Sequence, residues 1–341
     1  MKRKHFLSAL FPAAFTLSSA TVLEEKSVFL NRYHIKIPPY LKAGDVIGIT
    51  CPASYISLEE CEPAIQQMQN WGFKIEVGKT VGKRSFTFGG TDDERLADLQ
   101  YMLNNPNIKA IMCARGGYGL VRIIDALDFK KFKTNPKWII GFSDITVLHN
   151  HLNRNLHTAT LHAKMCNSFP ADWNLAEPIQ VETILSIKKA LMGERLGYSS
   201  MPNQFNCFGK ATGELVGGNL TLIATLAGSK SDLITKNKIL FLEDTHEQLY
   251  NLDRLFFNLK RSGKLDNLSG LIIGGFNPKP DDAGEEFGKT IEAIVLEKVT
   301  EYHYPVCFDF PVGHQKSNFA LKCGVRHHLL VDENGGKLVE S

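Results

Sequence analysis

Short apolar runs alternate with helical patterns along the first half of this chain. Four of the runs have the character of buried strands, at residues 45–50, 74–77, 108–113 and 138–141. Helical apolar spacing follows each of them, at residues 61–71, 92–103, 120–127 and 144–152. Strands joined by helices form a parallel sheet with helices on both faces, and functional sites of such sheets lie at the carboxyl ends of the strands.

The regular alternation of strand and helix patterns ends at a polar stretch, residues 167–174, which contains Pro170. After this stretch we expect helices at 179–192, 220–226, 246–260 and 285–300, and strands at 213–216, 238–242, 271–273, 306–310 and 328–331. A chain of 341 residues, 43% of them hydrophobic, is long enough for two cores. We therefore predict an α/β fold with a Rossmann-like parallel-sheet N-terminal domain at 37–165, a linker region at 166–205 and a smaller α/β C-terminal domain at 206–335.

Residues 1–20 have the pattern of a signal peptide. Lys2, Arg3 and Lys4 precede a mostly apolar run, which ends in Ser18-Ser19-Ala20. The basic residues also resemble a degenerate twin-arginine leader, and the run is too short to span a membrane. We predict export to the periplasm without stable membrane insertion, with a cytoplasmic location as the alternative.

Charge and cysteine content exclude several classes of protein. The 39 Lys and Arg face 36 Asp and Glu, which leaves too small a basic surplus to favour nucleic acid as a partner. The seven cysteines form no C-x-x-C pair and have mostly apolar neighbours, as buried structural thiols do. No His-Glu-x-x-His motif is present, since His246-Glu247 lacks the second histidine, so the sequence offers no metal site.

The segment Trp138–Ile145 is the clearest candidate for a catalytic motif in the sequence. A buried strand runs through Gly141 into Ser143 and directly into a helix, which is the layout of a nucleophile elbow. The backbone N–H of Asp144 would then face a developing oxyanion. Ile145 stands where the motif has its second glycine, and capping of the helix by Ser143 or Asp144 is the structural alternative.

A glycine-rich turn, Arg115–Gly119, follows the preceding strand. Its glycines, Gly116 and Gly117 among them, can expose backbone N–H groups to an anion or an oxyanion. Arg115 could bind a substrate carboxylate or an internal acid. The turn lacks the Gly-Lys-Ser/Thr ending of a phosphate loop and the spacing of a dinucleotide motif, so a nucleotide cofactor is disfavoured.

Two further groups complete a candidate hydrolase site. His314 lies in a loop just after a strand, and the rival bases are His149, His151 and His162. Glu243 and Asp244 end an apolar strand, where an unpaired carboxylate is costly, and Asp244 is expected to cap a helix. In the predicted site His314 takes the proton of Ser143, and Glu243 fixes the tautomer of the imidazole.

Over about residues 37–331 the chain resembles the LD-carboxypeptidases, also called muramoyltetrapeptide carboxypeptidases, and the related microcin C self-immunity peptidases. Seven motifs carry the resemblance. They are Pro38–Asp45, Phe88–Arg95, Arg115–Gly119, Gly141–Asp144, Gly217–Leu220, Leu242–Asp244 and Gly313-His314. The resemblance implies a triad of Ser143, Glu243 and His314. The oxyanion and substrate-binding residues are then expected among Asp144, Gly116, Gly117, Arg115 and Asn219.

The same resemblance implies a reaction. The enzyme would be a serine carboxypeptidase that hydrolyses the bond between the L-centre of meso-diaminopimelate and a terminal D-alanine in murein tetrapeptides, in peptidoglycan turnover or recycling. It would be a homodimer with neither metal nor organic cofactor. A microcin C self-immunity-type serine peptidase and a non-catalytic peptidoglycan-binding protein are the alternatives. Many relatives are cytoplasmic, so an exported enzyme could act on intact wall peptide or on released muropeptides.

Overall fold

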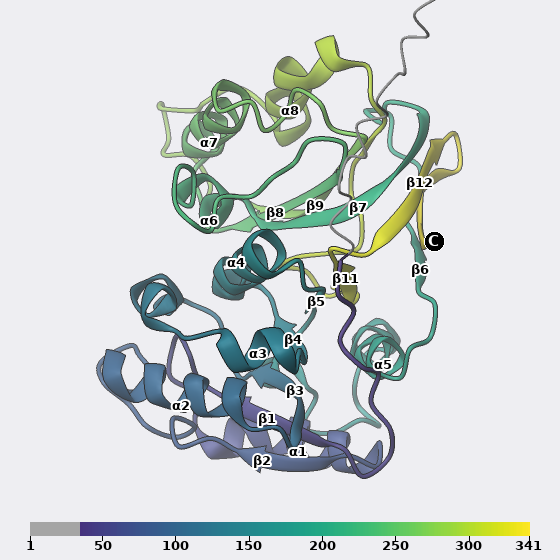
Figure 1. Cartoon of the computed structure of the whole chain (residues 1–341). Coiled ribbons are helices and arrows are strands. Elements are labelled where there is room, and N and C mark those ends of the chain that lie inside the picture. The colour runs from purple at the N-terminus through teal and green to yellow at the C-terminus, as the bar shows by residue number, and fades with distance from the viewer. Residues whose placement is uncertain (1–34) are drawn as a thin grey trace, which may run out of the picture. The chain divides into compact units, whose positions relative to one another are not determined.

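Two β-sheets organise the chain, one above the other in Figure 1. The structure is a computed structural model that describes residues 35–341. The predicted signal peptide at 1–20 lies outside the described residues.

The first sheet has the strand order β11-β5-β4-β3-β1-β2. Its members are β1 (Val46–Thr50), β2 (Lys74–Val77), β3 (Ile108–Cys113), β4 (Trp138–Gly141), β5 (Thr160–His162) and β11 (Leu321–Cys323). β1 to β5 pair in parallel, and β11 pairs antiparallel with β5. The predicted Rossmann-like parallel sheet is confirmed, with one antiparallel edge strand from the far end of the chain.

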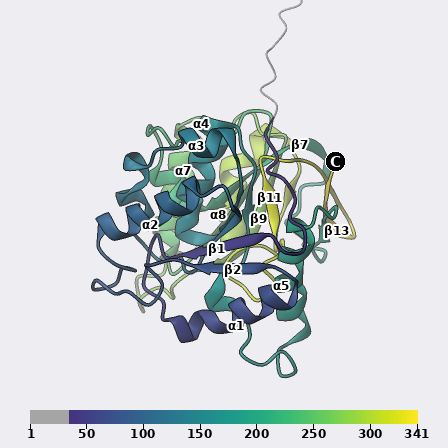
Figure 2. The same cartoon turned by 60° about the horizontal axis from the view of Figure 1, so that its bottom comes forward.

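Helices cover both faces of this sheet (Figure 2). They are α1 (Leu58–Asn70), α2 (Asp92–Asn104), α3 (Lys130–Thr134) and α4 (Thr146–Leu156). Alternate residues of β3 point to opposite faces, so Met112 packs in the cluster of α1 while Ile111 packs in that of α2 and α4. α1 and α2 each begin with a capping box, from Ser57 and Thr91, which fixes where the helices start.

The second sheet has the order β10-β9-β8-β7-β12-β13-β6. Its strands are β6 (Gly197–Ser199), β7 (Gly209–Asn219), β8 (Ile239–Thr245), β9 (Gly270–Asn277), β10 (Val306–Cys307), β12 (Arg326–Asp332) and β13 (Gly335–Glu340). β7 to β10 are parallel, and β12, β13 and β6 are antiparallel additions. The helices α6 (Leu220–Thr225), α7 (Leu249–Arg261) and α8 (Ile291–Val299) pack on the parallel part.

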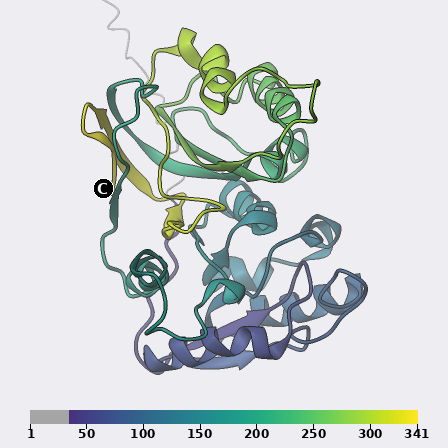
Figure 3. The ribbon, with the colours of Figure 1, turned by 180° about the vertical axis from the view of Figure 1, so that it is seen from behind.

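The predicted linker region contains a helix, α5 (Pro178–Leu191), which packs on the first sheet through Ile184 and Ile187 (Figure 3). β11, within the predicted C-terminal domain, also joins the first sheet. The domain limits at 37–165, 166–205 and 206–335 stay predictions.

Several predicted elements are wrong in detail. The helix expected at 120–127 is a pair of 3₁₀ turns, Leu120–Arg122 and Ile124–Ala126, which no side chain caps. The helix expected from 246 begins at Leu249, because His246 has a left-handed φ of 64°. The helix expected at 285–300 covers only Ile291–Val299, and the strand expected at 306–310 ends at Cys307.

All seven cysteines are free, and all but the partly buried Cys207 are buried, as predicted. No helix within residues 35–341 has both the length and the apolar character needed to cross a membrane.

Candidate active site

Ser143 lies in a strained turn at the end of β4. Its φ is 62°, in the left-handed region that side chains other than glycine rarely adopt. A Cβ on Gly141 would lie 2.8 Å from Cγ1 of Ile145, so the turn requires glycine there. The chain then passes through a 3₁₀ turn, Ser143–Ile145, into α4, which is the strand–turn–helix layout predicted from the sequence. Strain of this kind costs about 1–3 kcal/mol and concentrates at functional sites.

Glu243 and His314 form a hydrogen-bonded pair. Glu243 lies near the end of β8 and is fully buried. Its Oε2 accepts hydrogen bonds from Nδ1 of His314, at 2.5 Å, and from the backbone N–H of His314, at 3.2 Å. A carboxylate only accepts, so the proton of the neutral imidazole is on Nδ1 and the lone pair is on Nε2.

The pair also sets the acidity of the histidine. Burial lowers the pKa of His314, but its hydrogen bond to Glu243 and the negative charges of Glu243 and Asp244 raise the pKa by more. The net result is a pKa above the ordinary value of 6.5. His314 is therefore a stronger base than a free imidazole.

Gly313 allows His314 to reach Glu243. Its φ is 102°, and a Cβ added there would lie 2.4 Å from Cβ of Glu243. The backbone N–H of Gly313 donates to Oδ1 of the buried Asn318 at 2.9 Å, which anchors the loop. Only glycine fits this close approach of a loop to a buried carboxylate.

We expect Gly313→Ala to lower the free energy of unfolding by about 2–4 kcal/mol, from backbone strain and overpacking together. The matched control is Gly284→Ala, because Gly284 also has a positive φ, of 84°, but nothing lies within 4 Å of its Cβ position. In the control, only backbone strain should lower the free energy of unfolding, by about 1 kcal/mol. Urea unfolding measures both values, and equal losses would contradict the tight packing at Gly313.

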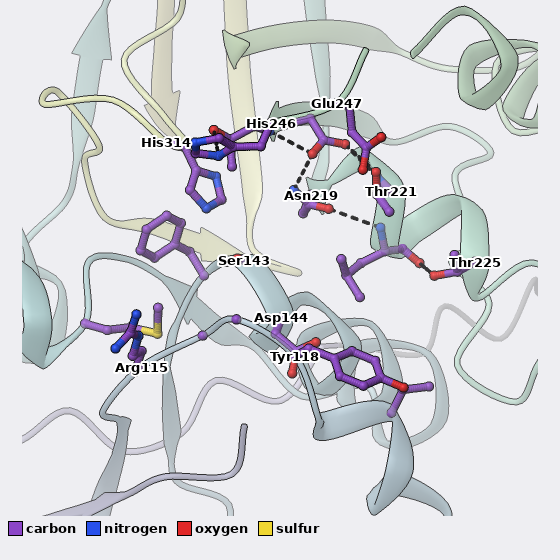
Figure 4. A pocket seen from close by; sticks show the side chains of 18 of the residues that line it. Arg115, Tyr118, Ser143, Asp144, Asn219, Thr221, Thr225, His246, Glu247 and His314 are labelled. Carbon is purple, nitrogen blue, oxygen red and sulfur yellow. Dashed lines mark hydrogen bonds between the residues drawn. The ribbon is translucent and has the colours of Figure 1, made fainter. Parts of the chain in front are cut away.

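One cavity of about 720 Å³ collects the predicted site residues. It is lined by Ser143, His314, Arg115, Gly116, Gly117, Asp144 and Asn219, together with others. Figure 4 shows side chains from both sheets facing it. Glu243 lies behind His314 and reaches the cavity only through the imidazole. Within residues 35–341 the Ser143 hydroxyl makes no hydrogen bond, so Ser143 and His314 share a cavity without a hydrogen bond between them.

The glycine-rich turn after β3 packs directly against Ser143. A Cβ on Gly116 would lie 3.0 Å from Cβ of Ser143, and one on Gly117 would lie 2.2 Å from Oγ of Ser54. In the described part of the chain, the backbone N–H groups of Gly117 and Asp144 donate to no acceptor. These two N–H groups are therefore free to bind an anion in the cavity that Ser143 also lines.

The side chain of Asp144 ties the two turns together. Its Oδ2 accepts from the backbone N–H of Leu120 at 2.8 Å, just beyond the glycine-rich turn. Burial raises the pKa of Asp144 to about 6. The carboxyl group of Asp144 therefore has a structural role, whereas its backbone N–H has no acceptor among the described residues.

Two other predicted residues line the cavity and also make structural contacts. Asn219 caps α6: its Oδ1 accepts from the N–H of Leu222 at 3.1 Å, and its Nδ2 donates to Asp244 at 3.0 Å. Asp244 also accepts from the N–H of Thr221, so the predicted capping role of Asp244 is present, on α6. Arg115 is exposed, and its guanidinium donates to the carbonyl of Tyr55 at 3.1 Å.

The rival histidines lie away from the cavity lining. His149 is buried with Nε2 2.9 Å from the carbonyl of Gly141, and burial lowers its pKa to about 4. His162 is fully buried, and His151 contacts Ser231. None of the three lines the cavity that holds Ser143.

Sequence reasoning missed several lining residues. Thr221, Thr225, His246 and Glu247 line the cavity, and the only signal for them was their closeness in sequence to Asn219 and Glu243. In the described part of the chain no group of three or more His, Cys, Asp or Glu side chains could hold a metal ion.

Comparison with known proteins agrees with this geometry. Residues 47–163 match the sequence model described as LD-carboxypeptidase N-terminal domain, and residues 212–329 match that of the LD-carboxypeptidase C-terminal domain. The probable murein peptide carboxypeptidase of Bacillus subtilis is 32% identical over 88% of this chain and 92% of its own length.

Two further relatives cover nearly the same length. The microcin C7 self-immunity protein MccF of Escherichia coli is 26% identical over 88% of this chain and 94% of its own length. The crystal structure of the muramoyltetrapeptide carboxypeptidase from Oxalobacter formigenes superimposes with a TM-score of 0.75 at 26% identity, over 87% of this chain and 98% of that chain. On the combined match of sequence, fold and length, this chain belongs to the LD-carboxypeptidase family.

Proposed function

We propose that this chain is a serine carboxypeptidase that releases the terminal D-alanine of murein tetrapeptides by hydrolysing its bond to the L-centre of meso-diaminopimelate. The Glu243–His314 pair carries the proposal, because its imidazole faces the cavity that Ser143 lines. The names of the relatives from Bacillus subtilis and Oxalobacter formigenes support a murein peptide as substrate.

The proposed reaction has two steps. Oγ of Ser143 attacks the scissile carbonyl while Nε2 of His314 takes its proton, and His314 then gives that proton to the departing amine of D-alanine. A water molecule next attacks the acyl-enzyme, again with His314 as base, and releases the tripeptide. Nε2 of His314 must reach Ser143 in the substrate complex, and catalytic contacts commonly tighten on substrate binding.

The free N–H groups of Gly117 and Asp144 are placed to stabilise the tetrahedral intermediate. Both residues line the cavity that Ser143 lines, and their N–H groups have no acceptor in the described residues. Fixed donors of this kind are among the largest single contributions to acyl-transfer catalysis. Glu243 holds the imidazole and stabilises the imidazolium that forms.

The test is mass spectrometry of L-Ala-γ-D-Glu-meso-diaminopimelate-D-Ala after incubation with residues 21–341. We expect loss of one alanine, unaffected by a chelator. The corresponding pentapeptide, whose terminal bond joins two D-alanines, serves as the matched control and should remain intact.

A parallel incubation with an aminoacyl-sulfamoyl nucleotide tests the alternative that the similarity to the microcin C7 self-immunity protein favours. Cleavage of the nucleotide alone would replace the proposed function by an immunity-type peptidase. Binding of the tetrapeptide without any cleavage would identify a peptidoglycan-binding protein instead.

We further propose export to the periplasm and a homodimeric state. The basic residues Lys2, Arg3 and Lys4 before an apolar run support export, and the resemblance to the family supports the dimer. A reporter enzyme that is active only after export, fused after residue 25, should therefore be active. Sedimentation should give twice the mass of one chain, and a monomer would contradict the dimer.

A further inference from the structure

A second cavity of about 650 Å³ lies beside the first. The two cavities share Phe142, Thr245, His246 and His314 in their linings, whereas Ser143 lines only the first. The imidazole of His314 therefore stands at the boundary between them.

The second cavity contains a buried lysine that the proposed mechanism does not use. Lys164 follows β5, the neighbour of the strand that carries Ser143, at the carboxyl edge of the sheet. It is only 7% exposed. Its Nζ donates to the carbonyl of Lys316 at 2.6 Å, and in the described part of the chain it has no other hydrogen-bond acceptor and no carboxylate within 4 Å.

The charge of Lys164 is not balanced by its surroundings. The cavity's other lysine, Lys316, pairs with Glu177 at 2.5 Å, and both side chains are exposed. Burial lowers the pKa of Lys164 to about 8, and no acid offsets this effect. A buried ammonium with unused N–H donors is costly unless an anion pairs with it.

We propose that the second cavity is the subsite for the leaving D-alanine, and that the Lys164 ammonium binds its terminal carboxylate. This inference rests on the proposed function. It assigns to Lys164 the recognition of a free chain end, which a carboxypeptidase requires.

The position of His314 supports this assignment. The acyl carbon of the substrate must lie at Ser143, in the first cavity, and the leaving nitrogen must lie near His314, which protonates it. A single carbon atom separates that nitrogen from the terminal carboxylate. A leaving group that extends past His314 therefore enters the second cavity, where Lys164 is the unpaired cation.

The test compares two tetrapeptides that end in D-alanine or in D-alaninamide. Wild type should prefer the free acid by about 10- to 100-fold in kcat/KM, the range of one charge-assisted hydrogen bond. Lys164→Met should abolish this preference. Its kcat/KM for the acid should fall, whereas its kcat/KM for the amide should stay within about threefold of the wild-type value. Lys164→Arg should keep part of the preference, and Lys164→Gln replaces the methionine variant if that variant does not fold.

Lys137→Met is the matched control. Lys137 is also buried, donates only to carbonyls and has a pKa that burial lowers to about 8, but it lines neither cavity. Its replacement should leave the preference for the acid unchanged. An equal loss for acid and amide in Lys164→Met would show a structural role and overturn the inference.

Binding separates this inference from the proposed function. Calorimetry with Ser143→Ala compares the affinities for the acid and amide peptides, with and without Lys164→Met, in the absence of turnover. If wild type cleaves neither peptide, the proposed reaction fails, yet a preference for the acid that depends on Lys164 still supports the subsite. Equal affinities, or a preference that survives Lys164→Met, would overturn it.

Discussion

Replacing Ser143 by alanine should lower kcat for alanine release by about 10⁴- to 10⁶-fold, the range found when one member of a serine triad is removed. Two other hydroxyls that line the cavity are already engaged: Thr221 donates to Asp244, and Thr225 donates to a carbonyl of its own helix. Release of labelled D-alanine measures the rate. Ser57→Ala, which removes a hydroxyl that only caps α1, should leave kcat unchanged.

A rate of Ser143→Ala within tenfold of wild type would show that Ser143 is not the nucleophile.

Stability gives an independent signature of the strained turn. Ser143→Gly removes the penalty of φ 62° and should raise the free energy of unfolding by about 1 kcal/mol while abolishing activity. Such opposite effects are expected where backbone strain serves catalysis.

The strands of the first sheet were predictable because they are buried on both faces. β1, β3 and β4 are short apolar runs ended by polar or glycine residues, and each was predicted within a residue or two. β5 and β11 were missed, since Thr160–His162 and Leu321–Cys323 have three residues each and form a pair only after the chain returns from the second sheet. Short strands of this kind depend on tertiary contacts that no local pattern contains.

The helix expected at 120–127 shows the same limit. Its apolar spacing is helical, but the N–H of Leu120 donates to Asp144, and Gly119 before it has a φ of 142°. The backbone direction at Leu120 is therefore set by the buried carboxyl group of Asp144, which lies in the turn after the next strand. Local propensity is a weak prior against such a contact.

The site residues also differ in whether the sequence could predict them. Ser143, Glu243 and His314 occur in recognisable motifs, and the structure places the last two, 71 residues apart in sequence, in one hydrogen bond. Lys164 had no such signal, because it stands in the mostly apolar run from Leu161 to Met165. Its significance arises only from burial without a charged partner, which is a property of the folded chain.

Replacing Glu243 by glutamine should lower kcat by about 10³- to 10⁴-fold with little change of shape. The amide is nearly the same size as the carboxylate, so the buried site stays filled. Its N–H₂ group can, however, donate to Nδ1 of His314, which favours the tautomer with the proton on Nε2. In that tautomer His314 cannot accept the proton of Ser143. Steady-state kinetics on the tetrapeptide measure the loss, and an unchanged kcat would remove Glu243 from the triad.

The pH profile of the same variant distinguishes this role from a merely structural one. His314 must be neutral to act as base, so kcat/KM should rise with pH through the pKa of His314. In wild type this acid limb of the profile should lie above pH 6.5, because Glu243 and Asp244 together raise the pKa more than burial lowers it. In Glu243→Gln the burial remains and the charge is gone, so the limb should move to lower pH. Asp244→Asn removes a neighbouring charge without a hydrogen bond to the ring and should move the limb less. A limb that stays in place in Glu243→Gln would mean that another group controls the base.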